Sequence, residues 1–355
     1  MPKMLERLLL RSRETRETPA IPLNSLQMAT REKMFRKYAD GTYATVDVPC
    51  LCGAQGGQVV VERDRYGLPS PSAICRVCGI VRTTPRLTDD SLAAFYDIEY
   101  RPLYDGTLEA QDDFLTLQRA RGVNIRHFAG DLLSASSRIV DLGCGAGWTL
   151  LPFREAGHWV AGCDLGSTYL EAGRSRGLDL RHGDHTTLID VAPFDLVILS
   201  HVFEHITDPR KLMNEIKPML APGGLVYIEV PGLQEIPTSY GDPLRYFQNA
   251  HLWNFDLASL TAVMAGYGYR RVRGNEFIRS VFTPDGSAHP TDNDGYGRAV
   301  RALSRAEANR RASDARRMAV GAARKALGPE RASKWKRAIL TSRGLWPGSR
   351  DVDGA

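Results

Sequence analysis

Hydrophobic and polar positions follow their most regular pattern after residue 137, where short apolar runs alternate with longer amphipathic segments. Runs of β-formers predict strands, and apolar residues recurring every three to four positions predict helices. The predicted strands are RIVDLG, HWVAGCDLG, LDLRHGD, FDLVILS and GLVYIEVPG, and the predicted helices are TLLPFREAG, STYLEAGRSRG and DPRKLMNEIKPML. Strands and helices alternating at this spacing predict a parallel sheet covered by helices on both faces. Such sheets bind ligands at the carboxyl ends of their strands.

The flanking segments differ from this core in composition and pattern. FDLASLTAVMAGYG predicts one more helix, and YRRVRGN with FIRSVFTP predicts a closing antiparallel pair of strands. The predicted organisation is a helical arm (1–47), a Cys-rich β unit (48–86), a helical connector that covers a binding pocket (87–132), the α/β domain (133–282), a Gly/Pro/Asp-rich linker (283–297) and a basic helical tail (298–355).

Four of the six cysteines form two close pairs, Cys50 with Cys52 and Cys75 with Cys78. Both pairs end in Cys-Gly, and short paired spacings without a convincing secretion signal favour metal over disulfides. The pattern predicts a zinc ribbon, with two knuckles joined by a hairpin. The first pair is C-x-C where ribbons normally have C-x₂-C, and a small hairpin with unligated thiols is the alternative. Four protein ligands would make the zinc structural.

A glycine-rich turn, IVDLGCGAG, follows the first strand of the α/β domain and precedes a helix. Its glycines allow the backbone to approach a ligand closely. The spacing is G-x-G-x-G, whereas a dinucleotide site would show G-x-G-x-x-G. Asp141 lies two residues before the first glycine, where a carboxylate would repel a pyrophosphate but attract an amino group.

These residues resemble the first motif of class I S-adenosylmethionine-dependent methyltransferases, D/E-x-G-x-G-x-G, and the resemblance continues in order over residues 137–282. It implies that Asp164 holds the ribose hydroxyls and that Asp184 contacts the adenine amino group. The later blocks are FDLVILSHVFEHITDP, MLAPGG and LVYIEVPG. The cofactor-binding residues implied are Asp141, Gly143, Cys144, Gly145, Gly147, Asp164, Leu165, Asp184, His185, Ser200 and His201.

The stretch HVFEH, residues 201–205, matches the H-x-x-E-H pattern of one class of zinc peptidase. A buried strand leads into it and Thr-Asp-Pro follows as a helix start, so we expect a loop at the carboxyl edge of the sheet. His201 and Glu204 are then candidates to face the methyl acceptor. His251 is the favoured general base, because H-x-x-x-F after the fifth strand is frequent in the resembling family. Tyr246, Asn249 and His205 are expected to line the acceptor pocket.

A metal-dependent variant of this site is the less favoured alternative. Small-RNA terminal 2′-O-methyltransferases carry E-x-x-E-H here and a distant histidine, which together hold a divalent ion. This chain has His201 in place of their first glutamate, and losing a carboxylate weakens a site for hard ions.

The Cys-rich opening followed by PRLTDDSLAAFYDIEY resembles zinc-ribbon methyltransferases that act on sugars. The resemblance implies S-adenosylmethionine as cofactor, structural zinc, and a small-molecule or lipid-linked saccharide as acceptor. Sugar C-methyltransferases carry a further Rossmann-like domain that the basic tail does not resemble, so O-methylation is favoured. RNA 2′-O-methylation and sugar C-methylation are the alternatives, and a non-catalytic interaction protein is a remote third.

Charge is unevenly distributed along the chain, whose net charge is +5. Residues 298–350 carry 15 Lys and Arg against 3 Asp and Glu, which would suit an anionic membrane or partner as well as a solvated helix face. Nucleic acid is disfavoured, since the ribbon shows no basic-aromatic interleaving. No apolar run approaches the roughly 20 residues of a membrane span. We expect a cytoplasmic protein, with peripheral contact at the inner membrane surface as a further possibility.

Overall fold

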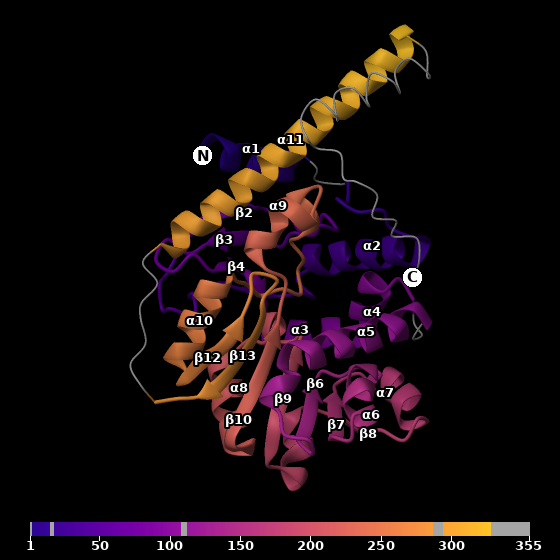
Figure 1. Cartoon of the computed structure of the whole chain (residues 1–355). Coiled ribbons are helices and arrows are strands. Elements are labelled where there is room, and N and C mark those ends of the chain that lie inside the picture. Colours follow the sequence, from indigo (N-terminus) through magenta and orange to yellow (C-terminus); the bar gives the residue numbers. More distant parts are fainter. Residues whose placement is uncertain (1, 15–17, 108–111, 287–293, 328–355) are drawn as a thin grey trace.

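The computed structural model describes residues 2–14, 18–107, 112–286 and 294–327. Its centre is a seven-stranded mixed sheet with the order β12-β13-β10-β9-β6-β7-β8 (Figure 1). The strands are β6 (Arg138–Leu142), β7 (Trp159–Asp164), β8 (Asp179–His182), β9 (Phe194–Ser200), β10 (Leu220–Glu229), β12 (Tyr269–Gly274) and β13 (Arg279–Pro284). Strands β6 to β10 run parallel, and β13 pairs antiparallel with both β10 and β12. The predicted strand order along the chain and the closing pair are confirmed.

Helices cover both faces of this sheet, as predicted. One face packs against α5 (Asp112–Ala129), α6 (Leu151–Glu155) and α7 (Ser167–Arg174), and the other against α8 (Pro209–Ile216) and α10 (Leu257–Gly266). Side chains alternate between the two cores, so Ile139 of β6 faces the first group and Val140 the second. Asp208 and Asp256 cap the N-termini of α8 and α10 through backbone N–H groups. The fold is Rossmann-like.

A smaller sheet lies beside the large one and contains the Cys-rich segment. Its antiparallel strands are β2 (Gln58–Val61), β3 (Ser72–Ile74) and β4 (Val81–Thr83). Strands β2 and β3 form the predicted hairpin between the two cysteine pairs, and β4 pairs with β3. A fourth strand, β11 (Trp253–Asn254), comes from the segment between β10 and α10 and pairs with β4. The two units thus share a sheet, which the sequence did not lead us to expect. A separate two-stranded ladder joins β1 (Thr45–Val46) to β5 (Arg86–Leu87).

The first and last described helices, α1 (Pro2–Glu14) and α11 (Gly295–Leu327), lie against each other and against the small sheet (Figure 1). The buried carboxylate of Glu307 in α11 pairs with Arg11 of α1 at 2.8 Å and with Arg310 at 2.8 Å. The C-terminal helix is confirmed as far as residue 327. The rest of the predicted tail and residues 287–293 of the predicted linker lie outside the described residues, and the ends of that linker belong to β13 and α11 instead.

The predicted arm and connector also contain α2 (Ser25–Ala39), α3 (Asp89–Ile98) and α4 (Tyr100–Tyr104), and a short α9 (Ile236–Ser239) follows β10. Asn24 and Gln27 form a reciprocal capping box at the start of α2. Met34, Phe95 and Leu103 from these helices belong to the same core as the large sheet. The connector therefore packs between the small sheet and the α/β domain and reaches the carboxyl edge of the large sheet.

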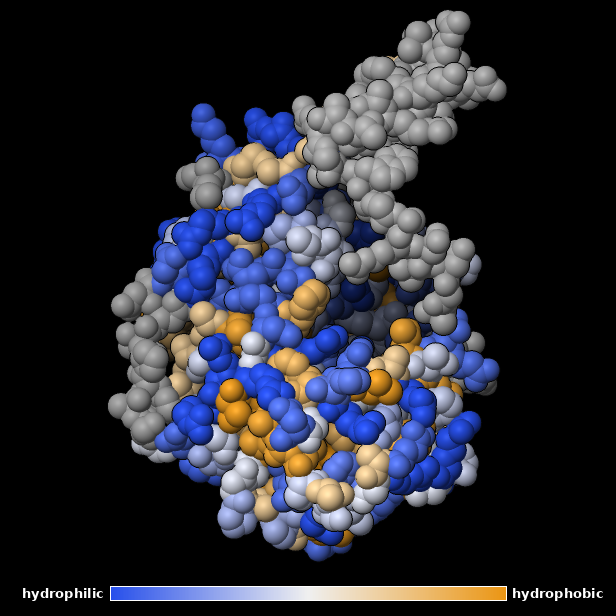
Figure 2. Space-filling view, viewed as in Figure 1, coloured by the Kyte–Doolittle hydropathy of each residue, from blue (hydrophilic) through white to orange (hydrophobic). Residues whose placement is uncertain are grey.

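Hydrophilic side chains dominate the face shown in Figure 2, and apolar residues form only small patches in its lower half. Within the described part of the chain, every helix is too short or too polar to cross a bilayer.

Candidate active site

The glycine-rich turn joins β6 to a 3₁₀ turn at Trp148–Leu150, at the carboxyl edge of the large sheet. Gly143 has φ 72°, and a Cβ there would lie 2.6 Å from Cγ2 of Val202. Gly145 has φ 56°, and its Cβ would lie 2.8 Å from Nε2 of Gln118. Both positions need glycine for backbone conformation and for space. The turn thereby brings its backbone next to the loop after β9.

Asp141 ends β6 directly beneath this turn, with only 3% of its surface exposed. The pKa of its carboxyl group is raised to about 8, chiefly by burial; Arg121 opposes this rise and the nearby Asp164 contributes to it. Asp164, at the end of β7, accepts hydrogen bonds from the backbone N–H groups of Gly145 (2.8 Å) and Gly166 (2.7 Å). A cationic amino group bound here would neutralise Asp141.

The remaining cofactor candidates lie on the same edge but differ in their contacts. Asp184 accepts a hydrogen bond from the N–H of Thr186 at 2.9 Å, and its pKa is lowered chiefly by the Thr186 side chain. Nε2 of His185 lies 3.3 Å from Glu215 in α8, so this side chain is committed to that contact. Ser200 donates to Glu229 at 3.3 Å. Cys144 and Gly147 belong to the turn, Cys144 being buried and Leu165 71% exposed.

Two polar residues of α5 face the glycine-rich turn and were missed from the sequence. Gln118 donates to the carbonyl of Cys144 at 3.2 Å, and its own Oε1 is buried with no hydrogen-bond partner among the residues the structure describes. Arg121 is close enough to Asp141 to lower its pKa, yet it forms no ion pair with the described residues. No local pattern in the sequence separates these side chains from ordinary polar positions of a helix.

The loop after β9 and the segment before β11 bring three histidines around one buried glutamate. Oε1 of Glu204 lies 3.6 Å from Nδ1 of His201, 3.7 Å from Nε2 of His205 and 3.8 Å from Nε2 of His251. Glu204 is fully buried, and neither of its carboxylate oxygens has a hydrogen-bond partner among the described residues. The ligand atoms of Glu204, His205 and His251 are mutually within 4.8 Å, which is also compatible with a divalent cation.

Electrostatics and backbone geometry define the state of this cluster. Burial alone would raise the pKa of Glu204, but His205, then His201 and His251, bring it down to about 2. Burial lowers the pKa of His205, and lowers that of His251 well below its ordinary value, which favours neutral imidazoles at pH 7. His201 adopts φ 57° and donates its N–H to the carbonyl of Glu229 at 2.8 Å. This left-handed residue turns the chain out of β9, so HVFEH is the expected loop, with a 3₁₀ turn at Phe203–His205.

Three tyrosines of the connector form one wall of the cluster. Tyr100 and Tyr104 stack with ring centroids 4.7 Å apart, and the hydroxyl of Tyr96 lies 2.9 Å from Nδ1 of His205. The rings of His205 and His251 meet edge to face at 4.9 Å. These tyrosines were not predicted as site residues, although their spacing of four positions would place them on one helical face, which is a usable signal.

The two other predicted pocket residues have different surroundings. Asn249 accepts a hydrogen bond from the Tyr104 hydroxyl at 3.0 Å, and its Nδ2 is buried without a hydrogen-bond partner in the described part of the chain. Tyr246 is buried, donates to the carbonyl of Pro231 at 2.8 Å and packs edge to face against Tyr240 and Phe247. Asn249 therefore has an uncommitted donor near the cluster, whereas the Tyr246 hydroxyl is already in use.

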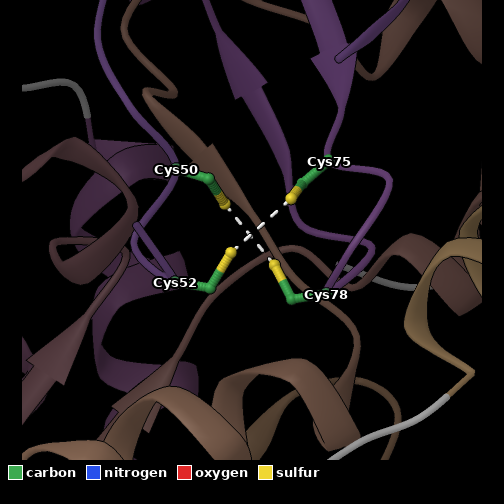
Figure 3. Close-up of side chains that lie close together, drawn as sticks. All are labelled: Cys50, Cys52, Cys75 and Cys78. Atoms are coloured by element: carbon green, nitrogen blue, oxygen red, sulfur yellow. Dashed lines mark hydrogen bonds between the residues drawn. The ribbon is translucent and has the colours of Figure 1, made fainter. Parts of the chain in front are cut away.

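The four cysteines predicted to bind zinc converge on one point (Figure 3). Sγ of Cys50 lies 3.4 Å from that of Cys78, and Sγ of Cys52 lies 3.6 Å from that of Cys75. All four are free thiols. Tetrahedral zinc with Zn–S bonds of about 2.3 Å requires sulfur atoms about 3.8 Å apart, so the arrangement fits this ion.

Comparison with known proteins identifies the α/β part of the chain. Residues 117–273 match the family model described as a methyltransferase domain. The matched range contains the glycine-rich turn, both acidic strand ends and the histidine cluster. This part of the chain is therefore similar to methyltransferase domains, and it has the Rossmann-like fold described above.

Curated relatives match a shorter part of the chain. The ubiquinone biosynthesis O-methyltransferase of Maricaulis maris is 35% identical over 97 residues, which is 25% of this chain and 38% of that protein. The ubiquinone biosynthesis O-methyltransferase of a Chelativorans species is 32% identical over 113 residues, which is 29% of this chain and 45% of that protein. The chain thus spans less than half the length of these relatives.

Solved structures resemble the chain more distantly. A Burkholderia thailandensis 1,6-didemethyltoxoflavin-N1-methyltransferase has a TM-score of 0.43 at 16% identity, covering 60% of this chain and 93% of that one. A Thermotoga maritima methyltransferase described as a possible histamine N-methyltransferase has a TM-score of 0.39 at 16% identity, covering 50% and 94%.

Proposed function

We propose that this protein transfers a methyl group from S-adenosylmethionine to a hydroxyl oxygen of a saccharide intermediate. The observation that carries the proposal is the cluster of Glu204 and three histidines beside the glycine-rich turn. Val202, next to His201, lies against Gly143, so the cluster borders the space above the turn. The resemblance of the Cys-rich opening to sugar-modifying methyltransferases supports the choice of acceptor.

The residues at the glycine-rich turn fit the cofactor. Asp141 would bind its cationic amino group, Asp164 the ribose hydroxyls and Asp184 the adenine edge. Gln118 and Arg121 would extend this set, and Arg121, whose charge acts on Asp141, would pair with the carboxylate of the methionine moiety. When bound, S-adenosylmethionine supplies an activated methyl group and a neutral thioether leaving group.

The histidine cluster would activate the acceptor. The hydroxyl oxygen forms a bond to the methyl carbon while the carbon–sulfur bond breaks and its electron pair stays on sulfur. The hydroxyl proton passes to the neutral imidazole of His251, the proposed general base. Glu204, 3.8 Å away and negatively charged, stabilises the imidazolium that forms. His205 and Asn249 would position the acceptor, and Tyr100 with Tyr104 offers aromatic faces to a sugar ring.

The His251→Asn variant is expected to lower kcat by about 10²- to 10⁴-fold, since the hydroxyl loses its proton acceptor. Cofactor affinity should stay within about a factor of two, because His251 is not among the residues proposed to bind the cofactor. Because burial lowers the pKa of His251 well below 6.5, the wild-type rate should stay level from pH 8 to pH 6.5. His127→Asn, at an exposed position, is the control. Wild-type kcat in His251→Asn would exclude this base.

The Arg121→Gln variant is expected to weaken S-adenosylmethionine binding by about 10- to 100-fold, the value of a hydrogen bond between charged groups. Arg119→Gln is a matched control, because Arg119 lies on the same helix but pairs with exposed Glu155 at 2.7 Å. Titration calorimetry of both variants gives the comparison. Equal affinities would remove Arg121 from the cofactor site.

Acceptor class is decided by incubation with labelled S-adenosylmethionine and four kinds of acceptor. These are nucleotide sugars, lipid-linked glycans, a catechol of the type that ubiquinone relatives suggest, and a short RNA with added Mg²⁺ or Mn²⁺. Transfer to a saccharide oxygen supports the proposal. Transfer only to the catechol would favour the tyrosine wall as an aromatic platform, and cation-dependent transfer to RNA would favour a metal at Glu204, His205 and His251.

We also propose that Cys50, Cys52, Cys75 and Cys78 hold structural zinc. The near-tetrahedral convergence of four thiols supports this, and with four protein ligands the ion would have no open position for chemistry.

A further inference from the structure

The loop between β2 and β3 extends from the Cys-rich unit to the candidate acceptor site. Asp64 is buried and accepts hydrogen bonds from the N–H groups of Tyr66 and Leu68, both at 2.9 Å, and from that of Asn249 at 3.1 Å. The N–H of Arg65 donates to the carbonyl of Phe247 at 2.8 Å. These bonds fix the loop to the segment that immediately precedes His251.

Arg65 occupies this loop with a charge that no described carboxylate neutralises by an ion pair. Its guanidinium lies 4.9 Å from the ring centre of Tyr66 and 5.2 Å from that of Tyr104, and donates to the Tyr66 hydroxyl at 2.7 Å. Its Nε is buried without a hydrogen-bond partner among the described residues. Arg101, on the same connector as Tyr104, differs because Asp105 pairs with it at 3.1 Å.

Other polar groups without partners lie around Arg65. Nδ2 of Asn249 and Oε1 of Gln248 are buried without hydrogen-bond partners in the described chain, as are both oxygens of Glu204. The amide of Gln248 lies 2.7 Å from Nε2 of His251. Burial is the main cause of the low pKa of His251, and the positive charge of Arg65 contributes to it, which places the two side chains in one neighbourhood. Buried polar groups normally have partners, so such a gathering indicates a polar ligand.

We infer that Arg65 binds an anionic oxygen group of the methyl acceptor, either phosphoryl or carboxylate, with Asn249 as a second donor. This inference rests on the proposed function and narrows it: the acceptor is an anionic saccharide, such as a sugar phosphate, a nucleotide sugar or a uronic acid. The fork of donors on a guanidinium matches both phosphate and carboxylate. The guanidinium of Arg65 lies over the rings of Tyr66 and Tyr104, and its Nε–H group is available for a ligand.

The Cys-rich unit would then have a direct role in specificity. It supplies the anion-binding side chain, while the α/β domain supplies His251 and the cofactor site. The bonds from Asp64 and Arg65 to residues 247 and 249 keep the two groups at a fixed separation, so the anionic group would determine which hydroxyl reaches His251.

The test compares binding of four probes to the full-length protein by saturation-transfer NMR and tryptophan fluorescence. The probes are glucose, glucose 1-phosphate, UDP-glucose and glucuronate, which separate neutral, phosphoryl and carboxylate forms of one sugar. The wild type should bind at least one anionic probe about 10- to 100-fold more tightly than glucose, as expected for charge-assisted hydrogen bonds. Arg65→Gln should abolish this preference, and Arg65→Lys should retain part of it.

Two further variants make the result decisive. Arg63→Gln removes the same charge two residues away, where Arg63 donates to the carbonyl of Gly67 at 2.9 Å, and should keep the preference. Asn249→Asp places a negative charge at the proposed anion site with little change of side-chain shape, and it should remove the preference for anionic probes. This variant provides a test should Arg65→Gln fail to fold. Equal wild-type binding of neutral and anionic probes, or an unchanged preference in Arg65→Gln, overturns the inference.

Methyl transfer is measured separately, so the two proposals can fail independently. Anion preference that depends on Arg65, without transfer to any saccharide, refutes the proposed reaction and leaves the anion site standing. Transfer to neutral saccharides at the same rate as to anionic ones refutes only the anion site.

Discussion

The Asp141→Asn variant is expected to bind S-adenosylmethionine about 10²-fold more weakly than the wild type, since a buried carboxylate that pairs with a cation contributes several kcal/mol. The substitution keeps the shape of the side chain and the hydrogen-bonding oxygen but removes the charge. Because burial raises the pKa of Asp141 to about 8, most of the cofactor-free protein carries a proton there at pH 7. Binding the amino group should displace it.

Calorimetry in buffers of different ionisation enthalpy measures this displacement. The wild type should release about one proton per cofactor bound at pH 7, and Asp141→Asn should release none. Asp131→Asn, at an exposed residue paired with Arg273, is the control for a charge change elsewhere. Undiminished affinity in Asp141→Asn would show that the cofactor amino group is held by other residues.

The same carboxyl group should make the cofactor-free protein less stable as pH rises. Its folded pKa lies above its unfolded value of 3.8, so its contribution to stability is complete below pH 4 and is lost progressively up to about pH 8. Asp141→Asn avoids this loss. The variant should therefore gain about 2 kcal/mol relative to the wild type between pH 6 and pH 8, measured by denaturant unfolding without cofactor.

Removing the proposed zinc is expected to abolish methyl transfer while leaving cofactor binding largely intact. A Cys75→Ser variant should lose the ion and melt at a markedly lower temperature, since structural zinc contributes about 10 kcal/mol or more to folding in small domains. Transfer depends on the ribbon because β4 holds the His251 segment. The hydroxyl of Thr83 donates to the carbonyl of His251 at 2.8 Å, and its N–H donates to that of Leu252 at 3.0 Å.

Metal analysis gives a readout that does not depend on activity. The wild type should contain about one zinc per chain and Cys75→Ser none, as expected for a four-thiolate site. Cys163→Ser, outside the cluster, should keep its zinc. A zinc-free protein with full transfer activity would contradict the coupling between the Cys-rich unit and His251.

The α/β fold and the glycine-rich turn at the carboxyl edge of its sheet could be predicted because their determinants are local. Strand periodicity, helix-starting residues such as Asp208 and the glycine-rich turn each specify structure within a few residues. Asp141 and Asp164 could be placed because both end strands that run parallel. The convergence of Glu204 with His251 was harder to predict, since it depends on a contact between the loop after the fourth strand and a residue 47 positions later.

Other parts of the site left no local trace in the sequence. Strand β11 has two residues, which is too short to show the alternation of apolar and polar positions that predicts a strand. Its pairing with β4 is a tertiary contact. Arg65 and Arg121 resemble ordinary surface arginines in a loop and a helix, and only burial and the absence of a described ion-pair partner distinguish them. Tyr96, Tyr100 and Tyr104 are intermediate between the predictable and the unpredictable features. Their spacing of four residues is visible in the sequence, but their contact with the histidine cluster is not.

The pairing of β4 with β11 also bears on how the protein is made. Strand β4 leaves the ribosome about 170 residues before its partner is synthesised, which at roughly 5–20 residues per second is about 10–30 s. During that time the nascent chain presents a strand edge of the kind that pairs with other chains. Early zinc binding by the cysteines on either side of the hairpin would shorten the time that the Cys-rich unit spends as a flexible intermediate. The Cys-rich unit would thus emerge from the ribosome well before the strand that completes its sheet is synthesised.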